Sequence, residues 1–145
     1  MEKHFFLLAA IFIIILLTNT GILQAQGFHT VNNTLLLETT SAWNGDKINY
    51  PEGEAKITVL KIEIEPGVET GWHYHPVPSF AYILQGKLEI SLEDGSKITA
   101  SAGEAVAEVT NRIHNGKNIG DDTLILVVFY TGIDGSQLTI LQEGE

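Results

Sequence analysis

The stretch GVETGWHYHPVPSFAYILQG, residues 67–86, decides how the rest of the chain is interpreted. It holds His73 and His75 one residue apart, just before an apolar run. Because successive side chains of an extended segment point to opposite faces, these two imidazoles share one face of a strand. Such a pair is able to bind a single metal ion, although a pair of histidines that only form hydrogen bonds at the surface has the same pattern.

The composition indicates one acidic domain without cysteine. The chain has 145 residues, of which 44% are hydrophobic, enough for one domain with a core and too few for two ordinary domains. Its net charge of -10 argues against nucleic acid and anionic membrane surfaces, so the expected partner is a small molecule, a cation or another protein. The absence of cysteine excludes disulfides, thiolate metal sites and a cysteine nucleophile.

The N-terminus has the order of a secretory signal. Lys3 and His4 precede an uncharged apolar run at 5–17, which is followed by polar residues and Ala25. The run has 13 residues, and a bilayer requires roughly 20, so a retained anchor is the weaker alternative. We therefore predict a signal peptide at 1–25, an exported protein in the periplasm or outside the cell, and no stable membrane association after cleavage.

The remaining chain is divided by its turns and its alternating segments. We expect an N-terminal arm and edge strand at 26–55, with the strand itself at 35–40. A barrel core follows at 56–131, and a C-terminal strand and tail at 132–145.

Two glycines are expected to mark hairpins. The apolar segment 80–84 and the alternating segment 87–93 flank Gly86, which predicts that these two strands pair with each other. Asp94-Gly95 is a strong signal for a second, tight hairpin, because the turn needs a positive φ that glycine adopts readily.

The chain beyond the signal has no sustained helical period of apolar residues. The continuous apolar run at 123–130 predicts a central strand that is buried on both faces. Short strands at close, regular spacing indicate an all-β sandwich or barrel.

A third histidine extends the first pair into a candidate metal site. Of the five histidines, His4 lies in the signal and His29 in the arm, which leaves His73, His75 and His114. Three imidazoles leave coordination positions open for water or substrate, as catalytic sites do. The metals that such ligands accept include Fe, Mn, Zn, Ni and Cu, so the identity of the ion stays open.

Two spaced motifs resemble those of the cupin superfamily, over roughly residues 56–130. The family's first motif is resembled by the following order in this chain: Gly67, five residues, His73, one residue, His75, then Ser79, six residues, Gly86. The family's second motif is resembled by a later order: Gly103, five residues, Val109, Thr110, Asn111, two residues, His114, three residues, Asn118. The family's motifs have glutamate at the place of Ser79, and proline and glycine at the places of Val109 and Asn111.

The resemblance implies a single-domain cupin-type β-barrel, a double-stranded β-helix or jelly roll, with a divalent metal held by the three histidines. The family's carboxylate ligand is missing at Ser79, which removes one contact and one negative charge. The remaining set resembles the three-histidine cupins that bind Fe(II) and activate dioxygen, which implies a dioxygenase-type oxidoreductase acting on a small molecule. A non-catalytic module that binds a small molecule or metal is the alternative.

The sequence offers other candidate residues for the same site. Glu69 and Glu108 are possible replacements for the missing carboxylate, although each is by default a solvated surface acid. A metal-free isomerase with His114 and Tyr82 as acid and base is less consistent, because it leaves His73 and His75 unexplained.

The aromatic residues Phe80, Tyr82 and Phe129 are expected to line the substrate pocket. The alternative for Phe80 and Tyr82 is ordinary core packing. The resemblance also implies a homodimer that pairs through the edge strand predicted at 35–40.

Overall fold

A computed structural model describes residues 31–142, and this part of the chain contains only β-strands as regular structure. The strands are β1 (Ala55–Ile64), β2 (His73–Tyr74), β3 (Ser79–Gln85), β4 (Lys87–Leu92), β5 (Lys97–Ser101), β6 (Ala105–Ala107), β7 (His114–Asn118), β8 (Leu124–Ile133) and β9 (Ile140–Leu141). The predicted signal peptide, His4 and His29 lie outside the described residues. Within the described range, no helix has the length and apolar character that crossing a membrane demands.

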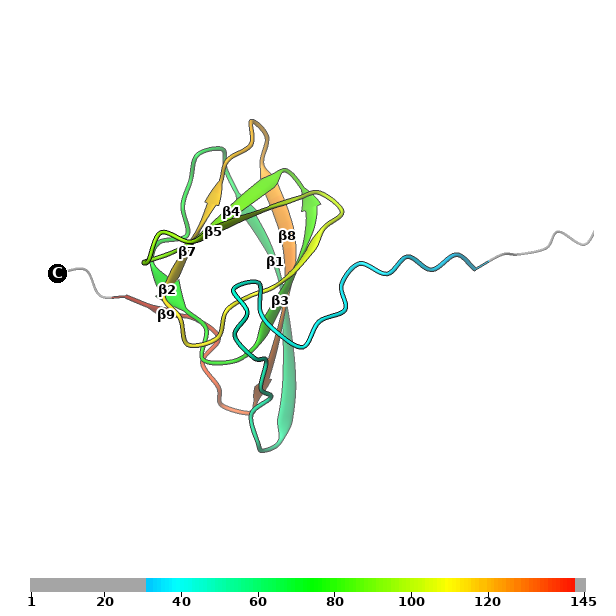
Figure 1. Cartoon of the computed structure of the whole chain (residues 1–145), viewed down its shortest axis with the longest axis vertical. Helices are drawn as coiled ribbons and strands as arrows, with labels where there is room; N and C mark the ends of the chain where they lie inside the picture. The colour runs from blue at the N-terminus through cyan, green and yellow to red at the C-terminus, as the bar shows by residue number, and fades with distance from the viewer. Residues whose placement is uncertain (1–30, 143–145) are drawn as a thin grey trace, which may run out of the picture. The chain divides into compact units, whose positions relative to one another are not determined.

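Two antiparallel sheets face each other around an interior, as Figure 1 shows. One sheet has the strand order β1-β8-β3-β6, and the other has the order β5-β4-β7-β2-β9. All nine strands belong to one compact unit. The prediction of an all-β domain is therefore confirmed.

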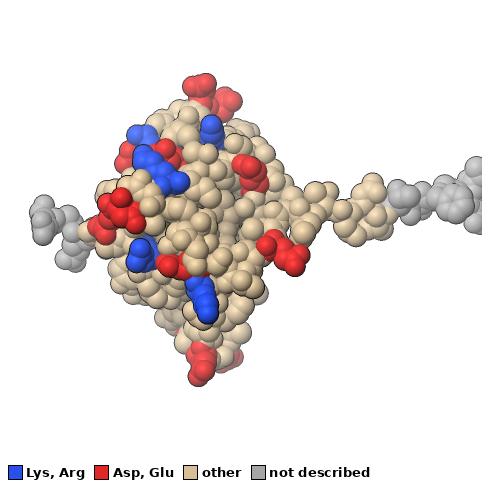
Figure 2. Space-filling model, in the orientation of Figure 1, with Lys and Arg blue, Asp and Glu red and all other residues tan. Residues whose placement is uncertain are grey.

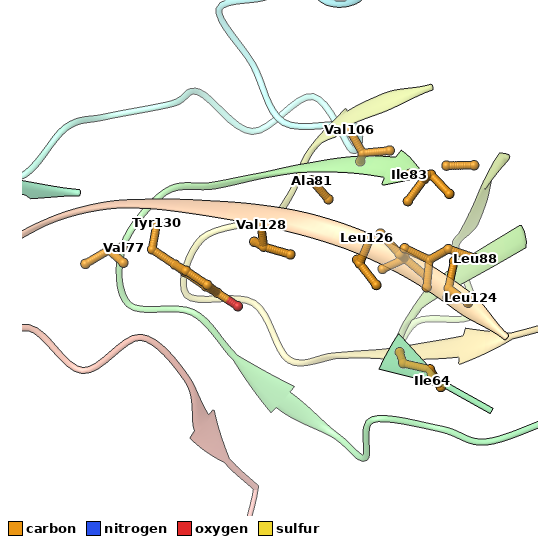
Figure 3. Packing of buried hydrophobic residues seen from close by; sticks show 12 residues of the cluster. Ile64, Val77, Ala81, Ile83, Leu88, Val106, Leu124, Leu126, Val128 and Tyr130 are labelled. Carbon is orange, nitrogen blue, oxygen red and sulfur yellow. The ribbon is translucent and has the colours of Figure 1, made fainter. Parts of the chain in front are cut away.

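The core lies between the sheets and is formed by alternate residues of each strand. On β8, the side chains of Leu124, Leu126, Val128 and Tyr130 are buried and project from the same side of the strand (Figure 3). The prediction that this strand is buried on both faces was wrong, since Phe129 is 43% exposed. A continuous apolar run does not distinguish a strand buried on two faces from one whose outer face is also apolar.

The predicted hairpin around Gly86 was also wrong. Strand β3 pairs with β8 and β6, whereas β4 pairs with β5 and β7, so the two strands that flank Gly86 belong to different sheets. Gly86, with a φ of 85°, turns the chain from one sheet to the other. A glycine between two strands predicts a change of direction and leaves the pairing partners open.

The second hairpin is confirmed. Strands β4 and β5 pair from Lys87↔Ser101 to Ser91↔Lys97, and the connecting turn contains Gly95 with a φ of 87°. The backbone N–H of Ser96 donates to Asp94 Oδ1 at 2.9 Å, which closes the turn.

The predicted edge strand at 35–40 is absent. The segment is extended but forms no strand, and Leu35 is 74% exposed. The first pairing of the described chain is the isolated bridge between Ser41 and Lys47. A short apolar run becomes a strand only where a neighbouring edge is available to pair with it.

Asn118, the last residue of the second motif, ties the end of β7 to two other segments. Its side chain is fully buried, and its Nδ2 donates to the carbonyl oxygens of Ile64 and Asp122 at 2.9 and 2.8 Å. Its Oδ1 accepts from the N–H of Gly120 at 2.9 Å. Every polar atom of this buried amide group therefore has a partner, which is the condition for burying it.

Acidic and basic side chains are interspersed on the face of the molecule in Figure 2. Several of them form ion pairs at the surface, among them the exposed pair of Lys117 with Glu69 and the pair of Lys97 with the half-buried Glu89, both at 2.8 Å. Exposed pairs of this kind contribute roughly 0 to 1 kcal/mol each, so the fold depends mainly on its core.

Candidate metal centre and cavity

Strand pairing brings the three predicted histidines together. His73 in β2 is the direct antiparallel partner of His114 in β7, and His75 follows β2 in a bridge with Thr110. All three side chains are buried, whereas Tyr74 between the first two is half-buried. The ring centroids lie between 4.4 and 4.9 Å apart. The pairing of β2 with β7 thus supplies the third imidazole to the pair that the alternation of β2 provides.

A backbone carbonyl orients each imidazole through Nδ1. The acceptors are Gly71 O for His73 at 2.7 Å, Leu138 O for His75 at 2.8 Å and Arg112 O for His114 at 2.8 Å. Because a carbonyl oxygen only accepts hydrogen bonds, Nδ1 carries the proton in each ring and Nε2 of the neutral ring has a free lone pair. This is the second contact by which metal-binding histidines are usually held in place.

The ligand atoms of the three histidines all lie within 4.8 Å of one another. Three buried imidazole nitrogens suit a divalent transition metal and leave other coordination positions open. The residues present therefore fit the metal that the sequence predicts, and they do not distinguish among the metals named.

The histidines lie at the wall of an interior cavity of about 200 Å³. Aliphatic side chains from both sheets form much of the wall: Ile62, Ile64, Leu88, Ile90, Leu126 and Val128. Thr70, Glu108, Tyr130 and Thr139 add polar atoms. The cavity thus combines an apolar surface with a polar group of residues around the histidines.

The prediction that Phe80, Tyr82 and Phe129 line this cavity was wrong, because all three belong to the outer face of the β1-β8-β3-β6 sheet. Phe80 and Tyr82 are half-buried and alternate with the buried Ser79 and Ala81 of β3. Phe129 is the cross-strand partner of Phe80. The one aromatic side chain of β8 that lines the cavity is Tyr130, whose position in the strand is one residue further on.

The expectation that Glu108 is a solvated surface acid was wrong as well. Glu108 is 8% exposed, and its Oε2 lies 3.1 Å from His75 Nε2 and accepts a hydrogen bond from Ser79 Oγ at 2.9 Å. Glu69, by contrast, is exposed and pairs with Lys117. The burial of Glu108 could have been predicted from strand alternation. Glu108 is two residues after Val106, whose side chain is in the core, so in an extended segment the two side chains point to the same face.

The buried groups of the site have strongly shifted pKa values. Burial works to raise the pKa of Glu108, but the hydrogen bond and the attraction of His75 outweigh it, and the pKa is about 2. Burial lowers the pKa of His73, and it lowers the pKa of His114 to about 4. For His75 burial is again the largest effect, yet its contacts with Glu108 raise the pKa. At neutral pH the site thus contains a carboxylate, and His73 and His114 are neutral.

These shifts predict that acid destabilises the metal-free protein. His114 stays neutral in the fold down to a pKa of about 4, while in the unfolded chain it takes up a proton near 6.5. The unfolded state therefore binds more protons, and stability falls as the pH decreases from 6.5 to 4. For His114 alone the loss is on the order of 3 kcal/mol. Urea unfolding at pH 7 and pH 4 measures it.

His114→Asn is the matched variant, because the raised pKa of His75 acts in the opposite direction and above pH 6.5, between pH 7 and the interval in which His114 acts. Glu108 stays ionised in the folded state, since its pKa of about 2 is below this range, but its protonation in the unfolded chain near pH 4.5 lowers the stability of both proteins. We expect the variant to lose less stability than the wild type between the two pH values. Equal losses in both proteins would contradict the assignment to His114.

A two-sheet β domain with three convergent histidines at a cavity has the features of a β-barrel with a potential metal site. A comparison with protein families identifies one family within this class. Residues 60–130 match the family described as Cupin domain. The similarity to this family thus extends over residues 60–130. No curated protein sequence matches the chain.

Several solved structures share this fold. A cupin-like protein from Thermotoga maritima is 19% identical, with a TM-score of 0.54 and coverage of 61% of this chain and 65% of that one. The DMSP lyase DddQ from Ruegeria pomeroyi is 22% identical, with a TM-score of 0.53 and coverage of 61% and 45%. The oxalate decarboxylase formate complex from Lactobacillus farciminis is 24% identical, with a TM-score of 0.51 and coverage of 59% and 26%.

The matched region spans less than two thirds of each of these structures, and about a quarter of the oxalate decarboxylase. At such identities the similarity concerns the fold, and function has to be inferred from the site itself.

Proposed function

We propose that this protein is a metal-dependent oxidoreductase of the dioxygenase type that acts on a small, largely apolar molecule. The observation that carries the proposal is the set of three buried imidazoles, each held through Nδ1 by a backbone carbonyl, which leaves Nε2 as the nitrogen that would bind a metal. His73, His75 and His114 would hold the ion. Fe(II) held in this way supplies open positions at which substrate and dioxygen are brought together.

The cavity supports a small substrate. Its volume of about 200 Å³ is below the roughly 300 to 1,000 Å³ of pockets that bind drug-sized ligands, which favours a small molecule. The aliphatic wall binds apolar surface and excludes water from the histidines. Burial raises the pKa of Tyr130 to about 12, so its phenol stays neutral and is able to donate a hydrogen bond to a ligand in the cavity.

A metal-independent binding module is the alternative, and one observation favours it. His75 Nε2 and Glu108 Oε2 lie 3.1 Å apart, which is the distance of an ordinary ion pair without a metal. Such a pair engages one of the three imidazoles without any metal, and the cavity then binds its ligand through the apolar wall alone.

Metal analysis followed by oxygen-uptake measurements tests the proposal. We expect protein purified without chelator to contain close to one divalent metal ion per chain. After loading with Fe(II), we expect oxygen consumption that depends on a small apolar substrate carrying a hydroxyl or carbonyl group. Absence of stoichiometric metal after loading contradicts the proposal, and unchanged ligand binding in the presence of a chelator favours the binding module.

We also propose that the protein is exported and forms a homodimer. Export with cleavage is supported by the signal-like residues 1–25. A protein that stays in the cytoplasm contradicts export, and an exported protein whose intact mass retains these residues contradicts cleavage. The dimer is supported by a row of apolar side chains across the outer face of one sheet, where Phe129 pairs with both Val59 and Phe80. Val59 and Phe129 are 49% and 43% exposed. Light scattering that shows only monomer at micromolar concentration contradicts the dimer.

A further inference from the structure

Glu108 lies where a carboxylate is able to reach the three-histidine site from a neighbouring strand. It is the residue after β6, and its backbone N–H donates to Ser79 O at 2.9 Å, so Glu108 and Ser79 are opposite each other across two adjacent strands. Both side chains are buried, and Ser79 Oγ donates to Glu108 Oε2 at 2.9 Å. The short side chain of Ser79 leaves room beside the longer side chain of Glu108.

The contact between Glu108 and His75 requires a positive charge. His75 Nδ1 faces Leu138 O at 2.8 Å, which leaves Nε2 of the neutral ring with a lone pair. This lone pair lies 3.1 Å from the carboxylate oxygen of Glu108, which also only accepts. Two acceptors at this separation repel each other unless a proton or a metal ion lies between them.

The separation itself suits a shared metal ion. Metal–nitrogen and metal–oxygen bonds of divalent ions are about 2.1 Å long, so two ligands at right angles around one ion are about 3.0 Å apart. The observed distance between His75 Nε2 and Glu108 Oε2 is 3.1 Å. The two atoms are thus close enough to be neighbouring ligands of one ion, at a distance that a hydrogen bond through a shared proton also has.

We propose that Glu108 is the fourth protein ligand of the metal bound by His73, His75 and His114, and that Ser79 is its positioning residue. The adjacent strand would thus supply the carboxylate that is absent at Ser79. With a divalent ion, three neutral imidazoles and one carboxylate give a site with a net charge of +1. This inference rests on the proposed metal site, and it adds an oxygen ligand that favours harder ions such as Mn(II) and Fe(II).

Metal affinity, measured by competition with a fluorescent chelator, tests the assignment. Mn(II) and Ni(II) are the two probes, because loss of an oxygen ligand weakens the harder Mn(II) more. For Glu108→Gln we expect Mn(II) affinity to fall about 100-fold and Ni(II) affinity about 10-fold. For Ser79→Ala, which keeps the carboxylate but removes its hydrogen bond, we expect a loss of about 10-fold for Mn(II).

A double variant and a control separate the ligand role from a structural one. Ser79→Glu combined with Glu108→Ser returns the carboxylate to the first strand, and we expect Mn(II) affinity within about tenfold of the wild type. Glu65→Gln removes an exposed acid and should leave both affinities unchanged. Circular dichroism verifies that each variant retains its β structure.

The outcomes distinguish the two proposals. Wild-type affinity for both metals in Glu108→Gln, or equal losses for Mn(II) and Ni(II), overturns the ligand assignment while leaving the three-histidine site intact. Failure of the double variant to bind Mn(II), although folded, also overturns it. If the wild type binds neither metal, the metal site and the role of Glu108 are both rejected.

Discussion

Replacing His114 with alanine is expected to weaken binding of a divalent metal at least about 100-fold. The variant removes one of three convergent imidazoles and leaves only the pair on the β2 side, His73 and His75. Because the three ligand atoms lie on two paired strands, no neighbouring histidine of the described chain replaces the lost one. Competition titration with a chromophoric chelator measures the change in affinity.

Thermal stability provides a second measurement of the same loss. A metal that binds only the folded state at 100 times its Kd stabilises the wild type by about 2.7 kcal/mol, and the His114→Ala variant should gain almost nothing. His29→Ala is the matched control, because His29 belongs to the N-terminal segment and was not predicted to be a ligand. Equal stabilisation of the wild type and His114→Ala by metal would show that His114 is not a ligand.

Replacing Gly86 with alanine is expected to lower the free energy of unfolding by about 3 kcal/mol or more. Gly86 has a φ of 85°, where a side chain is unfavourable, and a Cβ built there would lie 2.9 Å from the Cα of Leu124. Leu124 is fully buried at the start of β8, so the backbone that the new methyl meets cannot move without disturbing the core. Urea unfolding measures the difference from the wild type.

Gly95→Ala separates backbone strain from the close contact. Gly95 has nearly the same φ, 87°, but a Cβ there meets nothing within 4 Å. We expect this variant to lose only about 1 to 2 kcal/mol, the cost of the left-handed conformation. If the two variants are equally destabilised, the approach of Leu124 to Gly86 contributes nothing, and the prediction for Gly86 is wrong.

Features that depend on a few consecutive residues were predictable from the sequence. The alternation of strands, the hairpin at Asp94-Gly95 and the shared face of His73 and His75 all follow from backbone geometry over two to four residues. Two spaced motifs added His114 to the pair, and the structure brings these three side chains together.

Features that depend on distant residues were not predictable in this way. The turn at Gly86 is local, but the sheet to which each flanking strand belongs depends on partners far along the chain, such as β8 for β3. The mistaken pocket residues have the same origin. Phe80 and Phe129 are as apolar as core residues, and only the packing of the second sheet determines which face of β3 and β8 is interior.

The sequence alone therefore determined an all-β domain and the three histidines, because period-two alternation and motif spacing are properties of the chain itself. The tertiary structure decided how these histidines are held and what accompanies them. His75 is oriented by Leu138, 63 residues away, and the carboxylate beside it belongs to Glu108, which reaches Ser79 across 29 residues. Such contacts form only when the sheets pair and close, so no local pattern encodes them.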